Sequence, residues 1–131
     1  MDGKDAATGD APPAVSLRLT TLTQRRDFQR ASRAKRVAMP GFILQMRNRA
    51  DDEGPEIRIG YTCSKKVGNA VARNRAKRRL REIARLTLPT TAQSGTDYVL
   101  IGRRSATATL PFETLLTDLN KALGILHKGR S

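Results

Sequence analysis

Cysteine and histidine are almost absent from the sequence, with one of each among 131 residues. The single thiol, Cys63, cannot form an internal disulfide and cannot build a zinc site from several cysteines. The single imidazole, His127, stands near the C-terminus, so the chain has no pair of histidine ligands and no convincing Ser-His-Asp set. We therefore expect no catalytic residue in this chain, and nothing calls for an oxidising compartment.

Acidic residues are scarce, since 12 Asp and Glu stand against 25 Lys and Arg. Their one cluster, residues 51–53, is followed by Gly54 and Pro55, which predicts a hairpin-type loop. Solubility explains carboxylates in such a loop better than metal binding does. We therefore predict that the protein itself binds no metal and no cofactor.

Long apolar runs are missing as well. The longest strongly apolar run, residues 98–101, is far shorter than the roughly 20 residues that a membrane-spanning helix needs. The N-terminus carries Asp2, Asp5 and Asp10 instead of the basic start and apolar stretch of a signal peptide. These absences predict a soluble, cytoplasmic protein with no membrane-spanning helix.

What the sequence has in excess is positive charge, with a formal net charge of +13. Residues 17–50 and residues 65–85 each carry +8, whereas residues 1–16 and 51–64 are net acidic. A solubilising surface would spread its charge, while two concentrated blocks are typical of a polyanion-binding footprint. Nucleic acid and an acidic membrane surface are the two candidate partners.

The chain is about the size of one domain with a single core. Residues 1–16 are rich in Ala, Gly, Pro and Asp and predict a disordered tail, which leaves residues 17–128 as the domain and 129–131 as a C-terminal tail. Apolar periodicity predicts the following elements: a helix over 24–34, strands over 42–47, 57–64 and 98–102, a helix over 71–88, and a last helix from about 109–111. Pro89 is expected to end the helix before it.

This order of elements predicts an α+β sandwich, in which helices cover one side of a small sheet. Two or three strands are expected before the basic helix and one after it, and we expect them to form a four-stranded, mostly antiparallel sheet.

The helix over residues 71–88 carries its functional signal in the arrangement of its faces. One arc should pack on the sheet and contains Ala72, Ala76, Leu80, Ile83, Ala84 and Thr87. A second arc contains Asn74, Lys77, Arg78, Arg81 and Arg85, with Arg73 at its edge, and Arg75 and Arg79 extend the charge behind it.

Repulsion between like charges three and four residues apart costs about 0.2–0.5 kcal/mol per pair, and a bound phosphate backbone would offset that cost. A solvated helix face is the simpler alternative, but residues 65–85 hold nine cations against one acid. A membrane-surface helix would bring Trp, Phe or Leu on its apolar face, whereas this one brings mostly Ala. The helix is therefore predicted to bind nucleic acid, and no membrane partner is expected.

The run Ser64-Lys65-Lys66-Val67-Gly68-Asn69-Ala70-Val71-Ala72-Arg73-Asn74-Arg75-Ala76-Lys77-Arg78 closely resembles the signature of the protein component of bacterial ribonuclease P. The Arg73-Asn74-Arg75 core, with basic residues following through Arg81, is the part that is most specific to that family. The resemblance covers about residues 19–126 and includes an Asp27-Phe28 pair in the first helix.

The resemblance implies a left-handed βαβ crossover, as in the fold of ribosomal protein S5 domain 2, against the usual right-handed preference. It also implies a protein that assists a catalytic RNA, whose bound Mg²⁺ cleaves the 5′ leader from precursor tRNA. The implied partners are therefore the catalytic RNA and precursor tRNA. The residues that we assign to RNA binding are Lys65, Lys66, Asn69, Arg73, Asn74, Arg75, Lys77, Arg78, Arg79 and Arg81.

A groove for the single-stranded leader is expected on the even-numbered face of the strand over 57–64, because the side chains there are small and polar. Phe28 could stack on a base or only pack in the core. The predicted leader-binding residues are Arg25, Phe28, Arg58, Thr62 and Ser64. Ser32 and Gln45 stand where the family often has an aromatic residue, so we expect the leader to be held more by charge.

Two other functions fit part of this pattern. A structural RNA-binding protein of ribosomal type would share the charge and a similar fold, and only the Arg73-Asn74-Arg75 signature separates it from the first hypothesis. A non-specific DNA-binding protein is disfavoured, because the sequence has no helix-turn-helix and no heptad pattern.

Overall fold

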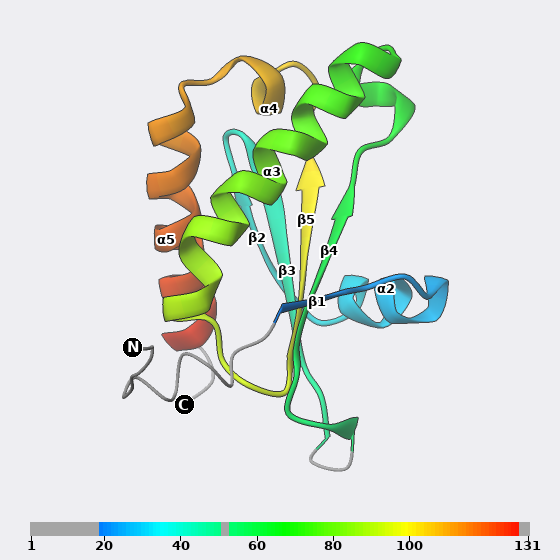
Figure 1. Ribbon diagram of the computed structural model, residues 1–131, viewed down its shortest axis with the longest axis vertical. Helices are drawn as coiled ribbons and strands as arrows, with labels where there is room; N and C mark the ends of the chain where they lie inside the picture. Colours follow the sequence, from blue (N-terminus) through cyan, green and yellow to red (C-terminus); the bar gives the residue numbers. More distant parts are fainter. Residues whose placement is uncertain (1–18, 51–52, 129–131) are drawn as a thin grey trace, which may run out of the picture.

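A sheet of five strands runs through the middle of the molecule, in the order β1-β4-β5-β3-β2 (Figure 1). The computed structural model describes residues 19–50 and 53–128, so the two predicted tails and the acidic residues 51 and 52 lie outside the described residues. The strands are β1 (Leu19–Thr21), β2 (Lys35–Met39), β3 (Phe42–Asn48), β4 (Ile57–Thr62) and β5 (Thr96–Gly102). β4 pairs in parallel with β1 and β5, whereas β3 pairs antiparallel with β5 and β2.

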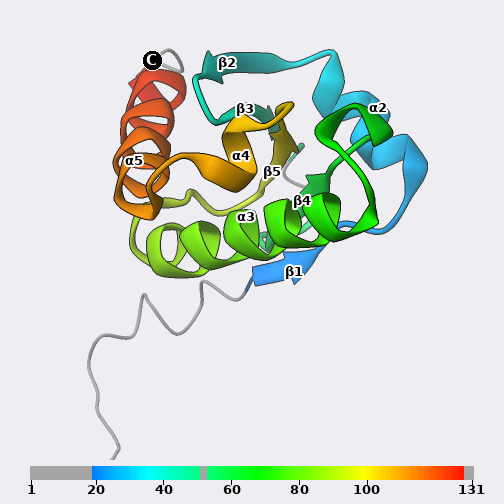
Figure 2. The same cartoon turned by 90° about the horizontal axis from the view of Figure 1, so that it is seen from above.

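Helices cover both faces of this sheet. They are α2 (Arg25–Ser32), the 3-10 turn η2 (Lys65–Val67), α3 (Ala70–Thr91), α4 (Ala106–Thr109) and α5 (Phe112–Lys128). Figure 2 places α3 and α5 on one side of the sheet and α2 on the other. Within residues 19–50 and 53–128, every helix is too short or too polar to cross a membrane.

Alternation along β4 explains why the two faces differ. Ile57 and Ile59 are buried against α3 and α5, whereas Gly60 lies under α2. The main core, between the sheet and α3 and α5, includes the buried side chains of Phe42, Leu44, Met46, Leu80, Ile83, Tyr98, Leu100, Leu115, Leu119 and Leu123. A smaller cluster beneath α2 consists of Leu22, Ala31 and Val99, with Phe28 and Ile101 packed against it.

The connection from β4 through α3 to β5 joins two parallel neighbouring strands. In Figure 1 both strands point up, α3 crosses in front of the sheet, and β5 lies to the left of β4. A connection that passes in front of the sheet and advances to the left is left-handed, against the preference of about 98% of such crossovers. The left-handed crossover implied by the family resemblance is therefore confirmed.

The helix α3 begins one residue before the predicted start and ends three residues after the predicted end. Asn69 caps its N-terminus, because its side-chain oxygen accepts a hydrogen bond from the backbone N–H of Ala72 at 2.9 Å. Pro89 lies inside the last turn and does not end the helix. Proline removes only one helical hydrogen bond there, while the neighbouring Leu88 is buried in the core and its carbonyl accepts from Ala92 N–H at 2.8 Å.

The predicted α+β class is confirmed, but three details of the prediction are wrong. The sheet has five strands instead of four, and its pairings divide equally between parallel and antiparallel. β1 and β2 were missed because both are edge strands whose residues are mostly exposed, which leaves little apolar alternation. Helices were predicted on one side only, yet α2 buries a narrow stripe around Ala31 on the other face.

Candidate nucleic-acid interface

The cations of α3 divide into three groups according to what each side chain contacts. The first group, Arg73, Lys77 and Arg81, recurs every four residues and lies over β4. Burial raises the pKa of the Cys63 thiol on that side of β4, and the positive charges of Lys77, Arg73 and Arg81 partly oppose this rise. The Arg81 guanidinium also stands 5.6 Å from the centre of the Tyr61 ring. Arg73 donates to the carbonyl of Gly68 at 3.0 Å.

The second group, Arg75 and Arg79, contacts α4 and the segment that follows it. Arg75 Nε donates to the carbonyl of Ala108 at 3.0 Å. Arg79 donates to the carbonyls of Thr107 at 3.1 Å and of Leu110 at 2.5 Å. Desolvation and the neighbouring charge of Arg75 lower the pKa of Arg79. These two arginines, both predicted to bind RNA, are therefore already bound to backbone carbonyls.

The third group consists of the side chains that point away from the protein. Asn74 and Arg78 are exposed, and no hydrogen bond or ion pair joins either side chain to another residue in the described part of the chain. Arg85 pairs with Glu82, whose carboxylate pKa is lowered by the hydrogen bond from Arg85. The face offered to a partner is thus centred on Asn74 and Arg78, with Lys77 and Arg81 beside them.

The segment before α3 forms one wall of an open groove of about 780 Å³. We call it the basic groove, and its lining residues are Ser64, Lys65, Lys66, Val67, Gly68, Gly102, Arg103, Arg104 and Ser105. Ser64 Oγ accepts from the N–H of Lys66 at 3.2 Å and so begins the η2 turn. Gly68 has a φ of +149°, and a Cβ there would lie 2.8 Å from the Cβ of Ala72, so a side chain is excluded.

Arg103 and Arg104 form the opposite wall of the basic groove and were not predicted as site residues. Arg103 donates from its side chain to the carbonyl of Met39 at 2.9 Å, and its backbone N–H donates to Thr107 Oγ1 at 2.7 Å. Arg104 is exposed. Two adjacent arginines after the last strand were the available sequence signal. The segment after residue 85 has only a small net charge, so charge clustering does not indicate a site there.

The predicted leader face is the side of the sheet that α2 covers in part. Phe28 is half-buried and packs directly on Gly60, where an added Cβ would lie 2.5 Å from Phe28 Cε1. Phe28 therefore packs in the small core while part of its side chain stays open to solvent. Thr62 is half-buried on the same face, while Arg25 and Ser64 are exposed.

Arg58 belongs to a buried ion-pair cluster and lies at the base of this face. Its Nε and Nη2 donate to the two carboxylate oxygens of Asp97 at 2.7 and 2.8 Å, and Asp27 of α2 lies 3.5 Å from it. The hydrogen bonds that Arg58 donates to Asp97 raise the pKa of Arg58. Asp97 also accepts from Arg49 at 2.6 Å. Arg58 thus ties α2 to β4 and β5, and its predicted contact with the leader remains a prediction.

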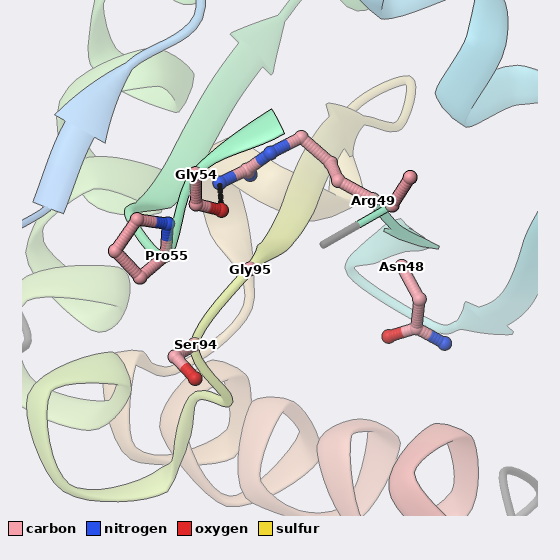
Figure 3. Close-up of a pocket in the computed structure, with 7 residues that line it drawn as sticks. Asn48, Arg49, Gly54, Pro55, Ser94 and Gly95 are labelled. Atoms are coloured by element: carbon pink, nitrogen blue, oxygen red, sulfur yellow. Dashed lines mark hydrogen bonds between the residues drawn. The ribbon is translucent and has the colours of Figure 1, made fainter. Parts of the chain in front are cut away.

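A second, smaller pocket of about 250 Å³ lies beside the loop between β3 and β4 (Figure 3). Its main polar side chain is Arg49, which donates to the carbonyl of Gly54 at 2.9 Å and to that of Glu56 at 2.6 Å. The N–H of Gly95 donates to the carbonyl of Pro55 at 2.8 Å. These hydrogen bonds join the residues of the loop to one another, although Arg49 Nε is buried without a hydrogen-bond partner in the described part of the chain, and we assign this pocket to loop structure. No group of three or more potential metal ligands occurs among the residues described.

Comparison with known proteins identifies the family. The ribonuclease P family model matches residues 18–127. The ribonuclease P protein component of Ruegeria pomeroyi is 56% identical over 120 residues, covering 88% of this chain and 96% of the relative. The corresponding protein of Caulobacter vibrioides is 46% identical over 108 residues, covering 82% and 71%.

Solved structures give the same assignment. The ribonuclease P protein of Staphylococcus aureus superposes with a TM-score of 0.67 at 29% identity, over 81% of this chain and 94% of that one. The Thermotoga maritima protein gives 0.65 at 28% identity, over 79% and 94%. The chain belongs to the ribonuclease P protein family, the protein component of the endonuclease that removes the 5′ leader from precursor tRNA.

Proposed function

We propose that this chain binds the catalytic RNA of ribonuclease P through the outward side of α3 and holds the 5′ leader of precursor tRNA on the face of the sheet beside α2. One observation carries the proposal. The outward cations of α3 and the basic groove occur on one connected stretch of the molecule, from Arg81 through Arg73 and Gly68 to Lys65. The α2 face adjoins this stretch along the chain, because Thr62 on that face lies two residues before Ser64, which lines the groove.

The arrangement suits a sugar-phosphate backbone because its donors are arginines and lysines held at fixed spacing. Arg78 presents a planar guanidinium that can bind two phosphate oxygens at once, and Asn74 beside it adds a neutral donor and acceptor. In α3, only Glu82 is acidic, and Arg85 already neutralises it. A polyanion that docks there meets no competing carboxylate on the helix.

In this proposal the chain binds and orients, and the hydrolysis belongs to Mg²⁺ held by the catalytic RNA. The cations of the basic groove reduce the repulsion between the RNA and the substrate phosphates that approach the same site. Phe28 and Thr62 border the open part of the α2 face, where a base of a single strand can stack on the exposed part of the Phe28 ring. The protein thereby raises the affinity for precursors that carry a leader.

The first test is a precursor-tRNA cleavage assay at physiological Mg²⁺, with catalytic RNA alone and with RNA plus this chain. We expect the protein to lower the precursor concentration that half-saturates cleavage. An equal concentration with and without the protein would contradict the proposal.

The second test separates a direct phosphate contact from general charge. We expect Arg78→Ala to weaken binding of the catalytic RNA and to reduce the slope of log affinity against log salt by about 0.7–0.9. Lys121→Ala on α5 removes one exposed charge away from the proposed interface and should leave the slope unchanged. Equal effects of the two variants would show that only net charge matters.

A further inference from the structure

The helix α4 is too short to stabilise itself. It has four residues, so most of its backbone carbonyls have no partner inside the helix. Arg75 and Arg79 supply those partners, with hydrogen bonds to the carbonyls of Thr107, Ala108 and Leu110. Two arginines of α3 therefore complete a structural element that lies far away in the sequence.

The same short helix holds the wall of the basic groove through Thr107. This side chain is fully buried, donates to the carbonyl of Gly41 at 2.5 Å and accepts from the backbone N–H of Arg103 at 2.7 Å. Arg79 therefore binds the carbonyl of Thr107, and the hydroxyl of the same Thr107 binds the backbone of Arg103, the first residue of the arginine pair.

The turn between Arg104 and α4 needs such support. Ser105 has a φ of +62°, the one positive φ of a residue other than glycine among the residues described. This conformation is unfavourable for residues with a Cβ and persists where the surrounding contacts fix it. The contacts that fix α4, immediately after Ser105, come in large part from Arg75 and Arg79.

We propose that Arg75 and Arg79 are positioning residues, which hold the Arg103–Arg104 wall of the basic groove in place for precursor tRNA instead of contacting RNA phosphates themselves. The proposal rests on the proposed function for the role of the groove. It divides the Arg73-Asn74-Arg75 signature between two tasks: Asn74 points outward to a partner, and Arg75 points to α4.

The experiment combines hydrogen exchange of the free protein with two binding measurements. In Arg79→Ala we expect amide exchange over residues 103–110 to accelerate roughly tenfold or more, because charged hydrogen bonds to the backbone are lost. Precursor affinity in the holoenzyme should fall, while the salt slope for the catalytic RNA stays unchanged. Arg78→Ala should give the opposite pattern, with normal exchange and a slope reduced by about 0.7–0.9.

Rescue by a neutral side chain separates positioning from charge. Arg79→Gln keeps an N–H donor and lacks the charge, so it should recover part of the exchange protection and of the precursor affinity. A phosphate contact would not be rescued in this way. If Arg79→Ala fails to fold, Arg75→Ala provides the same test, because both hydrogen bonds of Arg79 remain in that variant.

Either unchanged exchange over residues 103–110 or unchanged precursor affinity in the folded variants overturns the inference, as does a salt slope reduced as in Arg78→Ala. Failure of the parent chain to bind the catalytic RNA would overturn the proposed function instead. The exchange experiment on the free protein would then still decide whether Arg75 and Arg79 hold α4.

Discussion

Replacing Asp97 by asparagine tests whether the buried ion-pair cluster holds the sheet together. Asp97 is fully buried and accepts hydrogen bonds from Arg49 Nη1 at 2.6 Å and from Arg58 Nε and Nη2 at 2.7 and 2.8 Å. Arg47 Nη1 lies 3.5 Å from the same carboxylate. The side chain of Arg49 is only 1% exposed, so water cannot solvate the Arg49 charge once the carboxylate of Asp97 is lost.

The expected cost follows from what asparagine can and cannot replace. Its single carbonyl oxygen can still accept from Arg49 Nη1 and Arg58 Nε, but its NH₂ group would face the N–H of Arg58 Nη2, donor against donor. Removing one partner of a buried ion pair costs about 3–5 kcal/mol. Because two contacts persist, we expect about 3 kcal/mol, a large share of a typical total stability of about 5–15 kcal/mol.

Urea denaturation followed by circular dichroism measures this loss. With a slope of about 1–3 kcal/mol per molar urea, the midpoint should fall by about 1–3 M. Glu82→Gln is the control, since it removes an exposed ion pair on α3 and should leave the midpoint unchanged. A loss below about 1 kcal/mol in Asp97→Asn would refute the reasoning, because the cluster would then behave like a surface ion pair.

Three further predictions concern the two faces of β4. Gly60→Ala should destabilise the protein by about 1–3 kcal/mol in thermal unfolding, because the new Cβ would meet Phe28 Cε1 at 2.5 Å, whereas Gly124→Ala meets nothing within 4 Å and should not destabilise it. If the Phe28 ring stacks on the leader, Phe28→Leu should weaken the binding of precursor tRNA by about 1–3 kcal/mol and leave the binding of mature tRNA unchanged. Burial raises the pKa of Tyr61 from 10.0 to about 12. The free energy of unfolding should therefore fall as the pH rises from 10 toward 12, and Tyr61→Phe should remove the part of this fall that is due to ionisation of Tyr61.

The buried side of α3 could be predicted because it depends on local periodicity. Ala76, Leu80, Ile83 and Ala84 were expected to pack on the sheet, and all four are completely buried. Their spacing alone places them on one arc of a helix, whatever the rest of the chain does. The same periodicity could not reveal β1 or β2, since edge strands with exposed side chains have no apolar side to alternate with a polar one.

The role of individual cations could not be predicted, because it depends on partners far away in the sequence. Arg58 was assigned to the leader, yet its ion-pair partner Asp97 lies 39 residues further along the chain. Arg75 and Arg79 bind carbonyls that lie 33, 28 and 31 residues away. A helical wheel gives the direction of each side chain but not what occupies that direction. Charge counting therefore does not distinguish cations that contact the protein itself from cations that have no such contact in the described residues.

The basic groove shows how topology creates a site from two separate pieces of sequence. Since β4 and β5 are parallel neighbours, their carboxyl ends lie at the same edge of the sheet. Lys65 and Lys66 follow the first strand, and Arg103 and Arg104 follow the second, so four cations meet across one groove. An antiparallel pairing of the same two strands would place these pairs at opposite ends. The parallel crossover through α3 therefore does more than carry the basic helix, because it also assembles the second cationic surface beside it.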